Sequence, residues 1–419
     1  MRRAIWLAAV LAALCLFTAC SPATAEELLR APQLSSRLGV VQKALNDYLG
    51  EAAQLKYPRE GDTSSPFLFG DLDGDGTEEA VVLYQSSAQG LNVRLAVLEQ
   101  REGNWFVTQE LEGPTTEVAG ISQAALRGYG HDLVVVYAAP TSDAENYLAV
   151  YSYQDKTIRE EFVLPCSQYL VQDVTGSGSQ DLVLARRRGE GLVLTLFTSR
   201  DGELVNTQDL ALDPRFYSCE QLLYSASPHG HYIVMDGTDQ SGYTISDLVC
   251  YDQESGQLRR AVEGESLAAR TARLKPGLYS CDINGDGTVE IPVVEQEITT
   301  EDSARRLSLI TWRDFTRASS TVVQFGVLDM ECGFFLRLPV AWMGDVTVSD
   351  GPALDGWQVT SADGSLWYLR VLVCSREGAI PGAAREYSQI CLLGQNRLLV
   401  QENESYLPEG WTAEGLYIL

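Results

Sequence analysis

An internal repeat built on Asp and Gly constrains this chain more than any other feature of its sequence. Three copies align without gaps and begin at Asp71, Asp173 and Asp282, and two weaker copies fill the gaps between them. The first glycines of the five copies are Gly74, Gly128, Gly176, Gly230 and Gly285, so the steps between them are 54, 48, 54 and 55 residues. Self-similarity at a fixed period of this length indicates a repeat architecture.

Each copy has an apolar stretch before it and a β-rich run after it, which predicts a hairpin whose turn is the Asp/Gly segment. Further strand-like runs, such as LNVRLAVLEQ and NWFVTQELEG after the first copy, bring each repeat to about four strands. Four strands per period of about 50 residues are typical of a propeller blade and not of a helical solenoid. We therefore expect a mainly β chain, with a β-propeller-like array of about five four-stranded blades over residues 65–328.

The three strong copies resemble the FG-GAP/VCBS-type repeats of integrin-like propellers and of many bacterial surface proteins. Phe69 and Gly70, just before the first loop, fit the same style. The resemblance covers roughly residues 65–328. It implies a propeller fold and says little about function.

The spacing Asp-x-Asp-x-Asp-Gly turns the backbone around one point, so that side chains at positions 1, 3 and 5 converge there. A carbonyl at position 7 and an acid at position 9 complete a cage of oxygens, which suits Ca²⁺. The candidate ligands of the first loop are Asp71, Asp73, Asp75, the carbonyl of Thr77, and Glu79. Those of the fifth loop are Asp282, Asn284, Asp286, the carbonyl of Thr288, and Glu290. We expect structural Ca²⁺ in both, the alternative being turns held only by bonds between side chains and backbone.

The third loop is a weaker candidate for a metal site. It keeps acids only at its first and ninth positions, and its five candidate ligand residues are Asp173, Thr175, Ser177, Ser179 and Asp181. With two carboxylates in place of four, we expect an ordinary turn here. The turns around Gly128 and Gly230 lack the carboxylates and are expected to be metal-free.

The N-terminus reads MRRAIWLAAVLAALCLFTAC, a basic start followed by an apolar run that is too short for a spanning helix. The ending Phe17-Thr18-Ala19-Cys20 resembles the lipobox of bacterial lipoproteins. It implies that residues 1–20 are a lipoprotein signal peptide and that Cys20 is lipidated. The protein would then be anchored outside the cytoplasmic membrane. The alternative is an ordinary cleaved signal peptide.

Two flanking segments complete the predicted organisation. Residues 21–64 form a linker and a helix, because Leu38, Val41, Leu45 and Leu49 follow helical spacing. The repeat pattern fades after residue 328. The segment 329–419 loosely resembles a PsbP-like module, which implies a small α+β domain, and the alternative is one further blade.

The chain carries 31 basic and 57 acidic residues, a formal net charge of -26. Such a surface repels nucleic acid, so we expect no nucleic-acid partner. The three histidines, His131, His229 and His231, all lie in turns, and no GxSxG, HExxH, P-loop or dinucleotide motif is present.

These features favour a non-enzymatic, membrane-anchored binding or scaffold module with a protein or glycan ligand in the envelope. The alternatives are a carbohydrate-active propeller enzyme and an accessory subunit of an envelope complex. A deep hollow with clustered carboxylates and aromatic walls would favour the enzyme.

Overall fold

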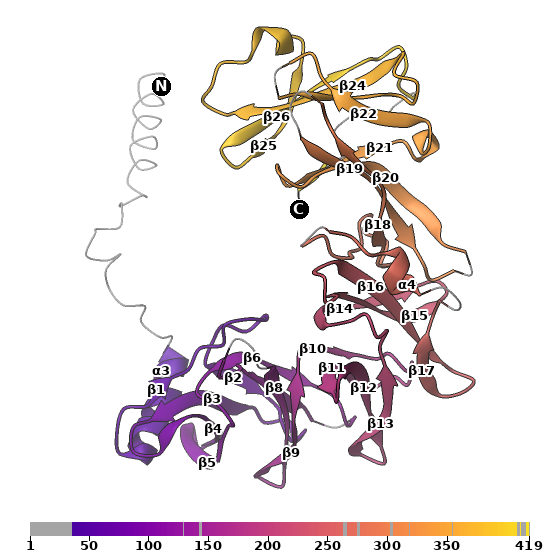
Figure 1. Cartoon of the computed structure of the whole chain (residues 1–419). Coiled ribbons are helices and arrows are strands. Elements are labelled where there is room, and N and C mark those ends of the chain that lie inside the picture. The colour runs from indigo at the N-terminus through magenta and orange to yellow at the C-terminus, as the bar shows by residue number, and fades with distance from the viewer. Residues whose placement is uncertain are drawn as a thin grey trace, which may run out of the picture.

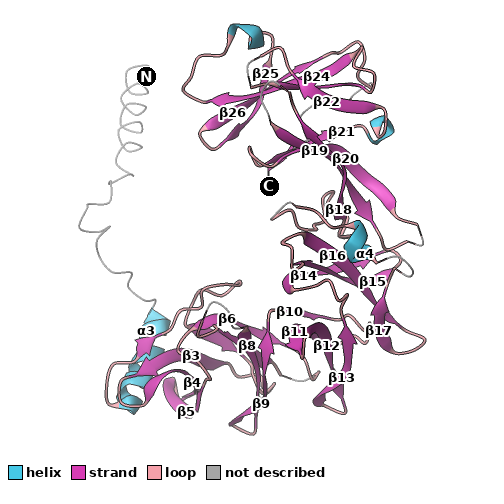
Figure 2. Cartoon of the chain, in the orientation of Figure 1, coloured by secondary structure: helices cyan, strands magenta, loops and turns pink. Residues whose placement is uncertain are grey.

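The computed structural model describes residues 36–128, 130–141, 145–262, 266–274, 277–301, 305–317, 319–353, 355–408, 411 and 416–418. The predicted signal peptide and Cys20 lie outside the described residues. The described strands form six antiparallel sheets, which follow one another around an open arc (Figure 1). Strands dominate and helical segments are few (Figure 2). The prediction of a mainly β chain built from four-stranded units is confirmed.

The sheets are built in chain order. The first holds β1 (Gln54–Leu55), β2 (Phe67–Gly70), β3 (Glu79–Ser86), β4 (Gly90–Arg101) and β5 (Asn104–Glu112). The second holds β6 (Val118–Ala124), β7 (Asp132–Tyr137), β8 (Asn146–Gln154) and β9 (Thr157–Cys166). The third holds β10 (Gln168–Gln172), β11 (Asp181–Arg188), β12 (Gly191–Arg200) and β13 (Glu203–Ala211).

The remaining sheets complete the arc. The fourth holds β14 (Ser218–Ser227), β15 (Gly230–Thr238), β16 (Thr244–Asp252) and β17 (Gln257–Arg260). The fifth holds β18 (Ile291–Thr299), β19 (Arg306–Asp314), β20 (Thr321–Asp329), β21 (Phe334–Leu338) and β27 (Leu416–Ile418). The sixth holds β22 (Val346–Asp350), β23 (Trp357–Ser361), β24 (Trp367–Ser375), β25 (Ser388–Leu393) and β26 (Asn396–Glu402). A short helix, α4 (Leu267–Arg270), lies between the fourth and fifth sheets.

The Asp/Gly segments occupy one structural position in every repeat. They join consecutive strands in the first four sheets, from β2 to β3, β6 to β7, β10 to β11, and β14 to β15. In the fifth repeat the segment leads into β18, and a β-bridge between Cys281 and Glu290 closes its base. Sequence period and sheet therefore correspond, because each repeat contributes one hairpin turn at the same edge of the array.

The helix α3 (Ser36–Leu49) covers the free face of the first sheet. Alternate residues of β3 point to opposite faces: Val81 and Leu83 join the core shared with the second sheet, whereas Val82 packs in the cluster that includes Val41 and Leu45. Both helix residues are fully buried, and each burial contributes about 1.5–3 kcal/mol. The helix thus ends the array on this side, where a closed ring would need another sheet. No helix within the described ranges is long and apolar enough to cross a membrane.

The C-terminal segment 329–419 contributes strands to the fifth and sixth sheets. Strand β21 pairs with β20 of the fifth sheet, and β22 to β26 form a sheet of their own. In the part of this segment that the structure describes, the only helical residues are two 3₁₀ turns, η1 (Val340–Trp342) and η2 (Gly382–Ala384). The described part of this segment is therefore built from strands and 3₁₀ turns. Leu369 and Val371 alternate along β24 and are buried in one core with Leu307 and Phe325 of the fifth sheet. Burial of every second residue favours a strand over a helix in this segment.

Candidate metal centre

The first Asp/Gly loop brings three acidic side chains together. Carboxylate oxygens of Asp71, Asp73 and Glu79 all lie within 4.8 Å of one another. Asp71 shapes the turn, since its two oxygens accept hydrogen bonds from the amides of Gly74 (2.7 Å) and Gly76 (3.0 Å). Both glycines have positive φ, 77° and 86°, a conformation that L side chains disfavour. The acids meet because the glycines permit this turn.

Glu79, at the ninth position of the first loop, is nearly buried, with 3 % of its surface exposed. Its Oε2 accepts the amide of Leu72 at 2.9 Å. Burial, together with the neighbouring carboxylates of Asp73, Asp75 and Asp71, raises the pKa of Glu79 to about 7. A divalent cation would offset both the burial and the mutual repulsion. The first loop therefore fits a hard cation.

Asp75 and Thr77, the remaining predicted ligands of the first loop, are placed differently. Oδ1 of Asp75 accepts the amide of Thr77 at 2.7 Å and so supports the turn. Asp75 is not one of the three acids that converge.

The fifth loop repeats the turn of the first. Oδ1 of Asp282 accepts the amide of Gly285 (2.7 Å), and its Oδ2 accepts the amide of Gly287 (2.8 Å). Asn284 donates its side-chain amide to Oδ2 of Asp286 at 2.9 Å. Oδ1 of Asp286 accepts the amide of Thr288 at 2.8 Å, and this bond holds the pKa of Asp286 below its usual value.

Glu290 is the ninth residue of the fifth loop and is fully buried. Its Oε2 accepts the amide of Ile283 at 3.0 Å, while Oε1 is buried and has no hydrogen-bond partner among the described residues. Burial, together with the neighbouring carboxylates of Asp286 and Asp282, raises the pKa of Glu290 to about 7. Buried polar atoms are normally paired, and a cation would provide such a partner for this oxygen.

The third loop satisfies its own carboxylates. Oδ2 of Asp181 accepts both the amide (2.9 Å) and the hydroxyl (2.8 Å) of Thr175. Asp173 accepts the amides of Ser177 (2.9 Å) and Gly178 (2.8 Å), and Oγ of Ser177 accepts the amide of Ser179 at 3.3 Å. The hydroxyl of Thr175 donates to Asp181, whereas the first loop has Asp73 at this position, and this bond favours an ordinary Asp/Gly turn here.

Contacts between each loop and a neighbouring sheet were not predicted. In the second repeat the amide of His131 donates to the carbonyl of Leu72 at 3.1 Å, and its Nδ1 lies 3.0 Å from the carbonyl oxygen of Asp71. A Cβ on Gly130 would lie 2.3 Å from the Leu72 oxygen, so only glycine allows this approach. The same kind of contact joins Ala125 to Gln180 (2.7 Å). The only sequence signal was the glycine itself.

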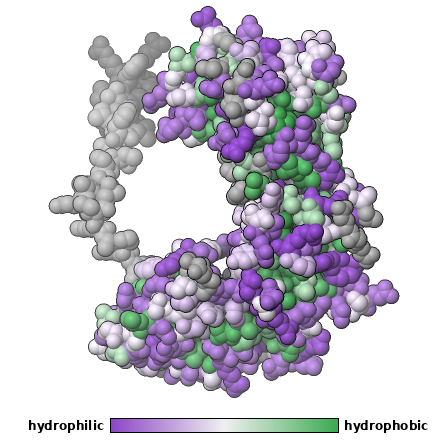
Figure 3. Space-filling model, in the orientation of Figure 1, coloured by the Kyte–Doolittle hydropathy of each residue, from purple (hydrophilic) through white to green (hydrophobic). Residues whose placement is uncertain are grey.

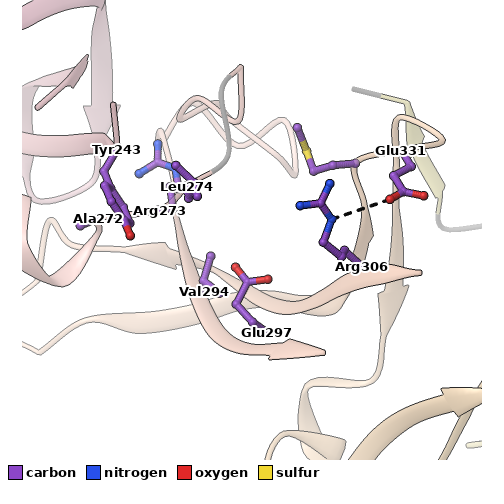
Figure 4. A pocket seen from close by; sticks show the side chains of 9 residues that line it. Tyr243, Ala272, Arg273, Leu274, Val294, Glu297, Arg306 and Glu331 are labelled. Atoms are coloured by element: carbon purple, nitrogen blue, oxygen red, sulfur yellow. Dashed lines mark ion pairs between the residues drawn. The ribbon is translucent and has the colours of Figure 1, made fainter. Parts of the chain in front are cut away.

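A hollow of about 600 Å³ lies between the fourth and fifth sheets (Figure 4). Tyr243 and Leu274 form one side, and Arg306 with Glu331 forms the other. Glu331 pairs with Arg306 at 3.9 Å, and Glu297 accepts the hydroxyl of Ser308 at 2.8 Å. Both carboxylates thus have partners within the chain. Hydrophilic residues cover much of the face seen in Figure 3.

No family model matches the chain, and no curated protein matches it. Among solved structures, Sqt1 of Saccharomyces cerevisiae is similar over 74% of this chain and 93% of its own, at 9% identity and a TM-score of 0.27. A hypothetical protein from Leishmania major is similar over 64% of this chain and 89% of its own, at 9% identity and a TM-score of 0.25. At such identities and TM-scores, neither likeness assigns a family or a function.

Proposed function

We propose that this chain is an extracytoplasmic bacterial lipoprotein, tethered to the cell membrane through Cys20. Its repeat sheets would be the blades of an open, propeller-type scaffold that binds a protein or glycan of the envelope and carries out no chemistry itself. Structural Ca²⁺ in the first and fifth Asp/Gly loops would hold the scaffold. The anchor rests on the lipobox-like sequence, and the metal on the geometry of the loops.

The observation that carries the metal part is the unpartnered Oε1 of Glu290. It belongs to a fully buried carboxylate, in a loop that also holds Asp282 and Asp286. The three converging acids of the first loop support the same interpretation. Ca²⁺ would supply positive charge and oxygen coordination, while Asp71 and Asp282 shape the turns through their bonds to backbone amides.

Direct binding tests this part of the proposal. Isothermal titration of the metal-free protein with CaCl₂ is expected to show two sites. Asp73→Ala and Asp286→Ala should each remove one site, because each deletes a carboxylate from one loop. Asp173→Ala is the matched control in the third loop and should leave both sites. A parent chain that takes up no Ca²⁺ at millimolar concentration would contradict the proposal.

The anchor is tested by cell fractionation. We expect the parent chain, expressed in a bacterial host, in the membrane fraction with a diacylated N-terminal cysteine detected by mass spectrometry. Cys20→Ser should abolish the lipid and release the protein, because the thiol is the acceptor of the lipid. Cys15→Ser, in the same leader, is the control and should change neither. Release of the parent chain itself would favour the ordinary signal peptide.

A further inference from the structure

A serine of the fourth sheet contacts the backbone of the fifth loop directly beside its buried acid. Oγ of Ser225, on β14, accepts the amide of Val289 at 2.9 Å. Ser225 is fully buried and Val289 is 7 % exposed, so water has little access to this amide. Val289 immediately precedes Glu290 in the chain. The hydroxyl therefore holds the peptide that joins Thr288 to Val289, immediately before Glu290 in the chain.

The next residue of β14 makes a second contact with the same loop. The amide of Ala226 donates to the carbonyl of Gly287 at 3.1 Å. The two bonds flank Thr288, so β14 holds the loop backbone on both sides of the predicted carbonyl ligand. On its other side Glu290 is held by the bridge to Cys281, with amide-to-carbonyl distances of 2.9 and 3.1 Å. The end of the loop is thus clamped between two segments.

From this geometry we infer that Ser225 is a positioning residue for the cation ligand Glu290, and that cation binding in the fifth loop tightens the junction between the fourth and fifth sheets. The inference rests on the proposed function, because it requires the fifth loop to bind Ca²⁺. Ser225 acts through Val289 and does not itself contact the cation. The unpartnered Oε1 of Glu290 is the observation that points to a ligand at this place.

Ser225→Ala removes the acceptor of a buried amide without touching a ligand. The loop must then either leave that amide unpaired or shift its backbone, and a shift moves Glu290 away from the oxygen cage. We expect Ca²⁺ to bind about tenfold more weakly to the fifth loop of this variant. Ser225→Thr retains a hydroxyl at this position and is expected to restore the affinity.

The experiment uses the full chain carrying Asp73→Ala, so that the first loop does not contribute. Isothermal titration with CaCl₂ measures the affinity of the fifth loop, and hydrogen–deuterium exchange is followed with and without Ca²⁺. In the Asp73→Ala parent, Ca²⁺ should slow the exchange of the Ala226 amide, whose acceptor belongs to the loop. Adding Ser225→Ala should reduce both effects. Ser152→Ala, a buried serine of the second sheet, is the matched control and should alter neither.

Each outcome decides a separate point. If the Asp73→Ala parent binds no Ca²⁺, the proposed metal site of the fifth loop fails. If it binds Ca²⁺ but protection is confined to residues 282–291, the coupling to the fourth sheet is wrong even when Ser225→Ala does not fold. Unchanged affinity in a folded Ser225→Ala chain overturns the positioning role and leaves the metal site standing.

Discussion

Asp236→Ala is expected to lower the free energy of unfolding by about 3–5 kcal/mol. Asp236 lies on β15 and is 1 % exposed, and it pairs with the fully buried Arg273 at 3.2 Å. Its oxygens also accept the amide (2.7 Å) and the hydroxyl (2.9 Å) of Ser280 and the hydroxyl of Ser246. Removing the carboxylate leaves a guanidinium charge in the interior without its anion. Burial lowers the pKa of Arg273, because removing a guanidinium from water disfavours its charged form.

Urea unfolding of matched variants measures the effect. Glu331→Ala removes the acid of the exposed Arg306–Glu331 pair and should change stability little, because solvent screens that pair. The double variant Asp236→Ala with Arg273→Met should cost less than the sum of the single changes, since neither charge is then stranded. Equal effects of Asp236→Ala and Glu331→Ala would refute a role for the buried pair.

Ca²⁺ is expected to raise the melting temperature of the chain, and a chelator to lower it. At a Ca²⁺ concentration one hundred times the dissociation constant, each occupied site adds about 2.7 kcal/mol to the free energy of unfolding. Two sites would add about 5 kcal/mol, a shift on the order of 10 °C. The physical source is the pairing of the buried carboxylates Glu79 and Glu290, whose pKa values are raised to about 7 by burial and by neighbouring carboxylates.

Differential scanning calorimetry with and without a chelator checks this expectation. The double variant Asp73→Ala with Asp286→Ala should show no response to Ca²⁺. The control, Asp62→Ala with Glu254→Ala, removes the same charge from exposed positions outside the three Asp/Gly loops and should respond like the parent. An unchanged melting temperature of the parent in chelator would exclude a structural role for the metal.

Much of the candidate site could be predicted from the sequence because its geometry is local. The acids and the glycines of positive φ lie within nine residues of one another, so their spacing nearly determines which side chains converge. Asp71, Asp73 and Glu79 do converge, whereas Asp75 supports the turn through Thr77. The orphaned oxygen of Glu290 depended on burial beneath neighbouring strands, which no local spacing encodes.

By itself, the sequence determined the four-stranded units, the turn at the start of each, and the helix near the N-terminus, because these follow from short-range periodicity and glycine placement. Only the tertiary structure decided how the units meet. Through long-range packing, α3 covers the free face of the first sheet and the C-terminal strands share a core with the fifth sheet. The same packing brings Ser225 within hydrogen-bond distance of the Val289 amide. Such contacts join residues far apart in the chain and depend on which apolar faces are left to be buried. A repeat period of about 50 residues does not determine which of these apolar faces pack together.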